Sequence, residues 1–265
     1  MRKFSPNRQR NHSSGPCDRR QSGNVSQVRL DTVLQGVPVY DQTSTLSAKA
    51  AGRIRRSRQI DRYFHEVSPE KRCLSIGSGP DVIDGWLCTD LIPLRRETVY
   101  LDATKRWPMP SASFRYMACE HMIEHVPYEA GLRVISEAHR VLQPGGVLRI
   151  STPDLEVIRL LPDSDDPDVH DYIRWFNRTF GSAAQRDDEA NPVHALNLMM
   201  HEFGHIHLYD EGMLRQVLAR AGFRQIVRCD PRMSDHAELV GVDRHADWIP
   251  DKANRVEALI LEATA

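Results

Sequence analysis

The sequence predicts an α/β fold in which helices cover both faces of a parallel sheet. Short apolar runs alternate with helical patterns from about residue 72 onward. One run leads straight into the glycines of "LSIGSG" (74–79), and two later runs end on an aspartate. Ligands of open α/β sheets bind at the carboxyl ends of the strands, so the site is expected where these glycines and aspartates lie.

The individual elements follow from periodicity and from breaker residues. The segments 43–66, 129–142 and 212–223 have helical spacing. The second of these helices should stop at Gln143-Pro144-Gly145-Gly146, because proline and glycine end helices. Short apolar runs rich in β-branched and aromatic residues predict the strands, which are 72–76, 86–90, 98–101, 115–119, 147–152, 224–229 and 257–264.

Composition divides the chain into three parts. Residues 1–30 are rich in Arg, Ser, Asn and Gly, which predicts a disordered basic tail. Residues 31–70 form an N-terminal helical segment, and 71–265 form the main domain. Within that domain, residues 154–210 interrupt the alternation with helical, aromatic stretches. We interpret them as an insertion that caps the active face.

Charge and cysteine content limit the class of protein. The formal net charge of −1 does not favour binding to nucleic acid through bulk charge. No apolar run approaches the roughly 20 residues that span a bilayer, so we expect no membrane span. No two of the five cysteines form a C-x-x-C pair, and their scattered positions favour reduced thiols in a cytoplasmic protein. Arginines between 53 and 62 indicate a solvated basic helix face, with an anion-binding surface as the alternative.

Three strand ends carry residues suited to a nucleotide-like ligand. Gly77 and Gly79 allow the backbone to turn tightly and approach a ligand closely. Asp90 ends the second strand, where a carboxylate accepts hydrogen bonds from both hydroxyls of a ribose. Asp102 ends the third, where it suits an adenine amine, while the Ala103 N–H suits a ring nitrogen. Each aspartate alternatively caps a helix or stabilises a turn.

Several motifs in order carry a family resemblance. The series "LSIGSGP…GWLCTDL…VYLDATKRWP…ACEHMIEHV…AHRVLQPGGVLRISTPDL…LYDEGMLRQVLARAGF" resembles the Rossmann-like S-adenosylmethionine-dependent methyltransferases over about residues 70–265. Within them it is most similar to a small bacterial group reading roughly "LNIGCG…GW.N.D" and "EH..EH…RVL.PGG.LR...PD". This resemblance implies a doubly wound, mostly parallel seven-stranded sheet with an antiparallel C-terminal strand, and S-adenosylmethionine as cofactor.

The resemblance also implies residue roles and reveals two departures. It implies that the methionine half is held by Gly77, Ser78 and Gly79, the ribose by Asp90, the adenine by Asp102 and Ala103, and that Cys119 and Glu120 border the sulfonium. Ser75 stands where many methyltransferases carry an acidic residue. The interval from Gly79 to Asp90 is short, so the first crossover helix should be shrunken or missing. A helix N-terminus is then not expected to assist the methionine carboxylate.

Candidate catalytic residues follow the fourth strand. In "EHMIEH", His121 and His125 are four residues apart, which predicts one helical face beside the cofactor. Histidine titrates near neutrality, so either is a candidate general base. The two histidines alternatively form a metal-ligand pair or a polar stripe. Asp154, after the fifth strand, contacts substrate or caps the next helix, and we favour the cap.

The stretch His201-Glu202-Phe203-Gly204-His205 matches H-E-x-x-H, the pattern of zinc proteases. That chemistry needs a regular helix and a third ligand. Gly204 weakens the helix, and Asp210 is placed to cap the next one. We therefore expect His201, His205 and His207 to line the acceptor pocket without a metal. The alternative is a zinc site formed by His201 and His205, with His194 or His207 as the third ligand.

The sequence thus predicts a cytoplasmic S-adenosylmethionine-dependent methyltransferase acting on an oxygen or nitrogen of a small molecule or saccharide. The saccharide is suggested only by the resembled group, whose members often accompany surface-polysaccharide synthesis. Two alternatives remain. One is a metal-dependent hydrolase built on the H-E-x-x-H histidines, and the other is a binding protein that keeps the fold without turnover.

Overall fold

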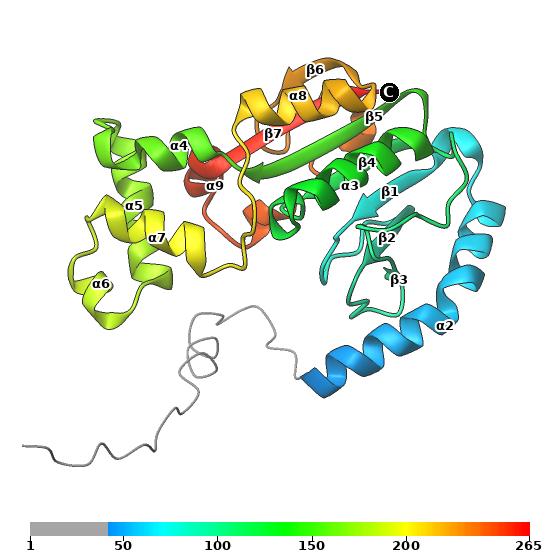
Figure 1. The fold of residues 1–265 in the computed structure, drawn as a ribbon, viewed down its shortest axis with the longest axis horizontal. Helices are drawn as coiled ribbons and strands as arrows, with labels where there is room; N and C mark the ends of the chain where they lie inside the picture. The colour runs from blue at the N-terminus through cyan, green and yellow to red at the C-terminus, as the bar shows by residue number, and fades with distance from the viewer. Residues whose placement is uncertain (1–41) are drawn as a thin grey trace, which may run out of the picture. The chain divides into compact units, whose positions relative to one another are not determined.

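The computed structural model describes residues 42–265, and the predicted tail and residues 31–41 lie outside this range. Seven strands form one sheet in the order β3-β2-β1-β4-β5-β7-β6 (Figure 1). Their bounds are β1 Cys73–Ile76, β2 Trp86–Asp90, β3 Val99–Tyr100, β4 Phe114–Glu120, β5 Leu142–Pro153, β6 Arg224–Arg228 and β7 Ala258–Thr264. The predicted α/β fold and all seven predicted strands are confirmed.

Strand directions also agree with the expected topology. Strands β1 to β5 pair in parallel, and β7 runs antiparallel to both β5 and β6. From β1 the chain builds outward to β2 and β3 on one side, and to β4 and β5 on the other. The strand order therefore reverses between β1 and β4, and a ligand crevice of such a sheet forms at that point.

The end of the second predicted helix differs from expectation. Helix α3 spans Tyr128–Val141, and the segment 143–146, expected to be a turn outside the sheet, belongs to β5. Leu142 pairs with Phe114, and regular pairing resumes at Val147 after an irregularity. The reason is that Gly145 adopts a φ of +76° and donates its N–H to the carbonyl of Ala265. The glycines bend the strand there without ending it.

Three helices pack against one face of the sheet. They are α2 (Gln42–Glu66), α3 and α8 (Glu211–Ala221), and their apolar residues join those of the strands in the main hydrophobic core. Helix α8 ends at Gly222 in the left-handed conformation, as the sequence predicted. Helices were expected on the opposite face as well, but the apolar cluster described there contains no residue of an α-helix. Ile83, Leu239 and Val242, from connections and the short turn η4 (Ala237–Leu239), pack against strand residues there.

The predicted insertion forms a second hydrophobic cluster. It contains α4 (Leu155–Leu160), η3 (Leu161–Asp163), α5 (Pro167–Phe180), α6 (Ala183–Asp187) and α7 (Pro192–His201). Residues of α9 (Asp251–Glu257) complete this cluster, which is separate from the main core. Figure 1 shows these helices gathered beyond the end of β5 and the start of β7. The insertion therefore lies at the carboxyl edge of β5, and its role as a substrate cap stays a prediction.

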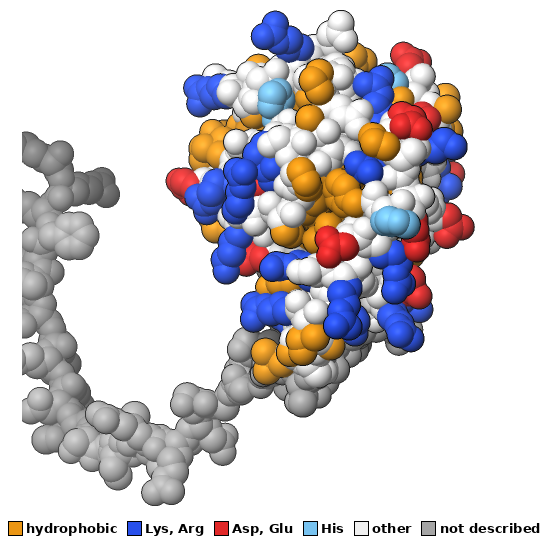
Figure 2. Space-filling model, turned by 90° about the vertical axis from the view of Figure 1, so that its right-hand side faces the viewer, with side chains coloured by type: hydrophobic (Ala, Val, Ile, Leu, Met, Phe, Trp, Pro, Cys, Tyr) orange, Lys and Arg blue, Asp and Glu red, His pale blue; other side chains and the backbone are white. Residues whose placement is uncertain are grey.

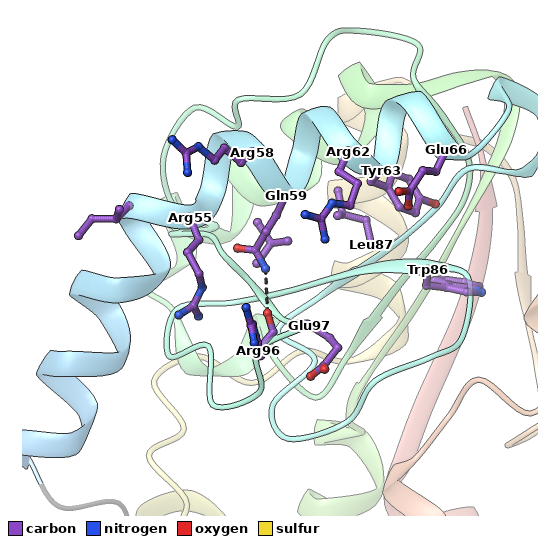
Figure 3. A pocket seen from close by; sticks show the side chains of 12 residues that line it. Arg55, Arg58, Gln59, Arg62, Tyr63, Glu66, Trp86, Leu87, Arg96 and Glu97 are labelled. Carbon is purple, nitrogen blue, oxygen red and sulfur yellow. Dashed lines mark hydrogen bonds between the residues drawn. The ribbon is translucent and has the colours of Figure 1, made fainter.

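Arginines of α2 line a groove of about 490 Å³ (Figure 3). Arg55, Arg58 and Arg62 line it from α2 and Arg96 from the connection before β3, and Gln59 donates to the Arg96 carbonyl at 2.9 Å. Trp86 and Val99, which line it too, begin their strands, so the groove lies away from the carboxyl edge. Figure 2 shows the Lys and Arg side chains on this side of the molecule. Its function as an anion-binding surface stays a prediction.

No helix within residues 42–265 is both long and apolar enough to cross a membrane. Cys73, Cys88, Cys119 and Cys229 are free thiols, the first three of them buried. The prediction of unpaired cysteines is thereby confirmed for these four residues.

Candidate functional site

The glycine loop lies at the point where the strand order reverses. Gly77 and Gly79 follow β1 with φ of +67° and +56°, backbone conformations that residues other than glycine rarely adopt. Asp90 holds this loop, because its carboxylate accepts the Gly79 N–H at 2.9 Å and the Ile92 N–H at 2.6 Å. Burial raises the pKa of Asp90, whereas these two hydrogen bonds lower it. The predicted loop and the predicted ribose-binding carboxylate therefore form one unit.

The loop has features of a polar ligand site. Within residues 42–265, no atom stands within 4 Å of the place where a Cβ on Gly79 would lie, so that side of the loop is open. The hydroxyl oxygen of Ser78 is buried and has no hydrogen-bond partner in the same part of the chain. A small cavity of about 30 Å³ lies beside it, lined by Ser78, Glu120 and Arg244 among others. The orphaned hydroxyl and the open glycine fit the polar half of a cofactor.

Room for that cofactor depends on two neighbouring side chains. Ligand pockets typically measure about 300–1,000 Å³, far more than this cavity. Met122 packs where a Cβ on Gly77 would stand, and the Arg244 side chain lines the cavity. Met122 is a flexible side chain, so we expect it to rotate away when a cofactor enters, whereas Arg244 would shift and stay beside the ligand.

Asp102 forms a turn at the end of β3. Its carboxylate accepts the Thr104 N–H at 3.2 Å and hydroxyl at 2.6 Å, and pairs with Lys105. Partial burial raises the pKa of Asp102, but these partners outweigh burial and the net effect is a lowered pKa. Asp102 thus stabilises a turn, and its contact with the adenine stays a prediction. A cavity of about 300 Å³ lies beside Asp102, between α2 and β3, and its lining includes Arg53 and Tyr100.

Ala103 and Cys119 contribute mainly to packing. The Ala103 carbonyl accepts the indole N–H of Trp107 at 2.9 Å. The Cys119 side chain is 3% exposed within the main core, and burial raises the pKa of its thiol. Contacts of either residue with a cofactor stay predictions.

Glu120, at the end of β4, anchors a second segment over the crevice. Its two carboxylate oxygens accept the backbone N–H groups of Arg244 and His245, both at 2.8 Å. The Nε atom of Arg244 is buried, has no partner among the described residues, and belongs to the side chain that lines the cavity beside Ser78. Arg244 lies outside every motif and was therefore not predicted from the sequence.

A further cavity, of about 220 Å³, lies between the sheet and the insertion. Its apolar wall comes mostly from the insertion: Trp175, Phe176, Phe180, Met199, Phe203 and Ile249. Its polar wall contains His121, Glu124, His125, His205, His245 and Glu257. We call it the histidine cavity. A largely apolar pocket with a few convergent polar groups is typical of a small-molecule site.

The predicted helical face carrying His121 and His125 is wrong. His121 lies outside any helix, with a φ of +42°, and His125 ends η2, a turn of only three residues (Ile123–His125). The physical reason is that the His121 N–H pairs with the carbonyl of Ser151 in β5, which continues the sheet ladder past β4. Both side chains nevertheless reach the histidine cavity.

Glu124 is fully buried at the centre of the polar wall. His121 Nδ1 lies 3.2 Å from one carboxylate oxygen, and the Thr152 hydroxyl donates to the other at 3.2 Å. Burial lowers the pKa of His121, but Glu124 outweighs burial and leaves it raised, while the pKa of Glu124 is lowered. The two residues thus favour an ion pair. His245 stacks on His121 at 4.0 Å between ring centroids.

His205 and His125 present their rings in a similar manner. His205 Nδ1 lies 2.7 Å from the Met199 carbonyl, and His125 Nδ1 lies 3.3 Å from the Gly204 carbonyl. Burial lowers the pKa of His205. The following N–H groups of Ile206 and His207 both donate to the Glu124 carbonyl. This contact holds the loop after α7 against η2 and brings the two histidines together.

The H-E-x-x-H stretch does not form a continuous helix. Helix α7 ends at His201, and Gly204 has a φ of +76°, so the predicted break is confirmed. Of the described histidines in this stretch, His205 lines the histidine cavity, whereas the exposed His201 and the half-buried His207 do not. The predicted acceptor contacts of His201 and His207 stay predictions.

Asp154 caps α4, as the sequence favoured. One of its oxygens accepts the Glu156 N–H, and the other pairs with Arg228 at 2.9 Å. Asp210 likewise caps α8. A substrate contact of Asp154 stays a prediction.

Comparison with known proteins gives one family. The family model described as "Methyltransferase domain" matches residues 50–227. A SAM-dependent methyltransferase structure from Archaeoglobus fulgidus is similar, with 14% identity, 85% of this chain and 100% of that chain covered, and a TM-score of 0.42. A second structure of this kind, from Mesorhizobium loti, has 16% identity and a TM-score of 0.43, and the match covers 77% of this chain and 96% of that chain. No curated protein sequence matched.

Proposed function

Because the chain belongs to the methyltransferase domain family, we propose that it transfers a methyl group from S-adenosylmethionine to an oxygen or nitrogen of a small-molecule or saccharide acceptor. The acceptor class rests on the sequence resemblance. Membership of the small bacterial group also stays a prediction.

The observation that carries the proposal is the coupling of Asp90 to the glycine loop. Asp90 fixes the Gly79 N–H at the reversal of strand order, where open α/β sheets bind nucleotide-like ligands. Each oxygen of this carboxylate has a further lone pair for a ribose hydroxyl. The same residue thus shapes the loop and faces the cofactor.

Other residues would hold the amino-acid half of the cofactor. The connection from Gly79 to Asp90 contains no helix among the described elements, so no helix N-terminus is present for the methionine carboxylate. Arg244 supplies positive charge at this place, and its Nε atom has no partner. The orphaned Ser78 hydroxyl offers a further hydrogen bond. We assign the carboxylate to Arg244 and Ser78.

Methyl transfer needs an acceptor close to the sulfonium. S-adenosylmethionine supplies an electrophilic methyl group. The acceptor atom contributes the electron pair of the new bond to carbon, the carbon–sulfur pair stays on sulfur, and the acceptor's proton leaves. We place the acceptor in the histidine cavity, which His121 joins to the end of β4. That His121 or His125 takes the proton stays a prediction, and pairing with Glu124 favours a His121 that already holds one.

The alternative of a hydrolase built on H-E-x-x-H receives no geometric support. A zinc protease presents both histidines from one helix, but α7 stops at the first of them and His201 is exposed.

Isothermal titration calorimetry with S-adenosylhomocysteine tests the cofactor site. Asp90→Asn keeps the shape of the side chain but removes its charge. Hydrogen bonds to charged groups contribute about 1.5–3 kcal/mol, so binding should weaken by roughly tenfold to a hundredfold. Asp84→Asn is the matched control, because Asp84 is an exposed carboxylate on the same connection. Equal affinities of wild type and Asp90→Asn would contradict the assigned site.

A further inference from the structure

The cluster at the centre of the histidine cavity has the composition of a metal site. Glu124, His125 and His205 each offer a ligand atom, and these atoms lie within 4.8 Å of one another. Two of the residues belong to η2 and the third to the loop after α7, so the fold brings them together. We propose that these three residues bind one divalent ion of the first-row transition metals.

The hydrogen bonds of the two imidazoles leave one nitrogen of each ring free. In each ring Nδ1 faces a backbone carbonyl, from Met199 or Gly204. A nitrogen facing a carbonyl carries the proton, so Nε2 keeps its lone pair. Metal-binding histidines almost always donate the other ring N–H in this way.

The carboxylate is held in a comparable manner. Glu124 is fully buried, and His121 and Thr152 each contact one of its oxygens. Burying a carboxylate is costly unless it is paired. The His121 contact meets part of that cost, and a cation bound to Glu124 would meet more of it. His125 is exposed, so an ion can enter from solvent.

The donor set selects the kind of ion. Two imidazoles and one carboxylate suit zinc, iron(II) or manganese(II), whereas magnesium prefers oxygen ligands alone. Bonds of roughly 2.0–2.2 Å to a shared ion require the three atoms to move closer by side-chain rotation. Three protein ligands also leave coordination positions open.

The open positions indicate the kind of acceptor, a step that rests on the proposed function. The three ligands and the aromatic wall line the same cavity. An acceptor with a planar or apolar body would pack against Phe176 and Phe203, while one of its oxygens reaches the ion. The ion then holds that oxygen and lowers the pKa of its hydroxyl.

The test is calorimetric titration of the metal-stripped full chain with Mn²⁺ and with Zn²⁺, in the absence of any methyl donor. We expect one ion per chain and at least tenfold weaker binding in Glu124→Gln, His125→Ala and His205→Ala. His201→Ala is the matched control, because it alters H-E-x-x-H but not the cluster, and should bind as wild type does. Mg²⁺ should bind far more weakly than Mn²⁺.

Two results would overturn the proposal. One is the absence of a stoichiometric ion in the wild type. The other is a loss in His201→Ala equal to that in His205→Ala, which would move the ion to the H-E-x-x-H pair. If Glu124→Gln fails to fold, as judged by its thermal transition, the metal affinities of His125→Ala and His205→Ala test the proposal instead. Cofactor binding is measured separately through Asp90, so failure of the metal site and failure of the proposed function are distinguishable.

Discussion

Two residues beside the crevice, Gly77 and His121, have left-handed backbone conformations and follow β1 and β4. For His121 this conformation costs of the order of 1–3 kcal/mol, a cost often found at functional sites. It is offset by the sheet bond to Ser151 and by the contact with Glu124. The strain places the imidazole over the histidine cavity instead of continuing the strand.

Two substitutions in the glycine loop, Gly77→Ala and Gly79→Ala, can be compared directly because both glycines have a positive φ. In Gly77→Ala the new Cβ meets the Cβ and Cγ atoms of Met122, whereas in Gly79→Ala it meets open space. Both substitutions incur a backbone cost of about 1–2 kcal/mol for a positive φ. Gly77→Ala should lower the free energy of unfolding further, by overpacking of roughly 1–3 kcal/mol. Urea unfolding measures both.

A third variant shows where the extra loss arises. Gly77→Ala combined with Met122→Ala removes the overlapping Cγ, and should recover part of the difference between the two glycine variants. Equal unfolding free energies for Gly77→Ala and Gly79→Ala would contradict the close packing of Met122 on the loop.

Elements were predictable wherever periodicity and capping agreed. The ends of α8 follow from Asp210 and Gly222, and the missing crossover helix follows from the short interval before Asp90. The entry of residues 143–146 into β5 was not predictable, because it depends on the hydrogen bonds of Gly145 and Gly146 with Ala265, far away in sequence. Local breaker signals carry no information about such partners.

The residues of the candidate site also fall into those that the sequence predicts and those that depend on tertiary contacts. Gly77, Gly79 and Asp90 were found because they end neighbouring strands, and strand ends meet at one edge. Glu124 was missed, although "EHMIEH" contains it, because its burial depends on Thr152 and on the loop after α7. The aromatic stretches of the insertion were expected over the active face, but the side chains that form the cavity wall were not identified. A tertiary fold is needed to bring α5 and α7 over the end of β5.

One ion-pair network fixes α3 to the connection before β4. Glu137 of α3 accepts the Trp107 N–H at 2.8 Å and binds Arg140 through both oxygens. Its hydrogen bond to Arg140 is the largest contribution that holds the pKa of Glu137 below its ordinary value of 4.5. A lowered pKa in the folded state means that ionisation of Glu137 stabilises the fold at neutral pH.

Glu137→Gln should therefore lower the free energy of unfolding by about 1–2 kcal/mol at pH 7. The difference from wild type should shrink as the pH falls below 4.5 and through the lowered pKa of the folded state, because wild-type Glu137 then becomes neutral as well. Denaturant unfolding at several pH values measures this. A difference that does not change between pH 7 and pH 3 would show that the charge of Glu137 contributes nothing.

At the scale of residues 42–265, polar side chains connect the main core with the apolar cluster of the insertion. The main core lies between the sheet and α2, α3 and α8, and the insertion has its own cluster. Glu257, which ends α9 directly before β7, joins them. One of its oxygens accepts the Tyr172 hydroxyl of α5 at 2.8 Å, and the other lies 2.8 Å from His245 Nε2. The insertion is thus connected to the sheet through a carboxylate at the cavity wall.

Tyr172→Phe should loosen the insertion while the sheet stays intact. The substitution removes a hydrogen bond to a charged, buried group, which contributes about 1.5–3 kcal/mol. Hydrogen exchange should become faster for backbone amides of α5 and α7, because a weakened junction favours local opening. Tyr209→Phe is the matched control, since the buried Tyr209 hydroxyl has no partner among the described residues and its removal should cost nothing. Uniformly faster exchange in β1 and β4 as well would mean that the insertion and the sheet open as one cooperative unit.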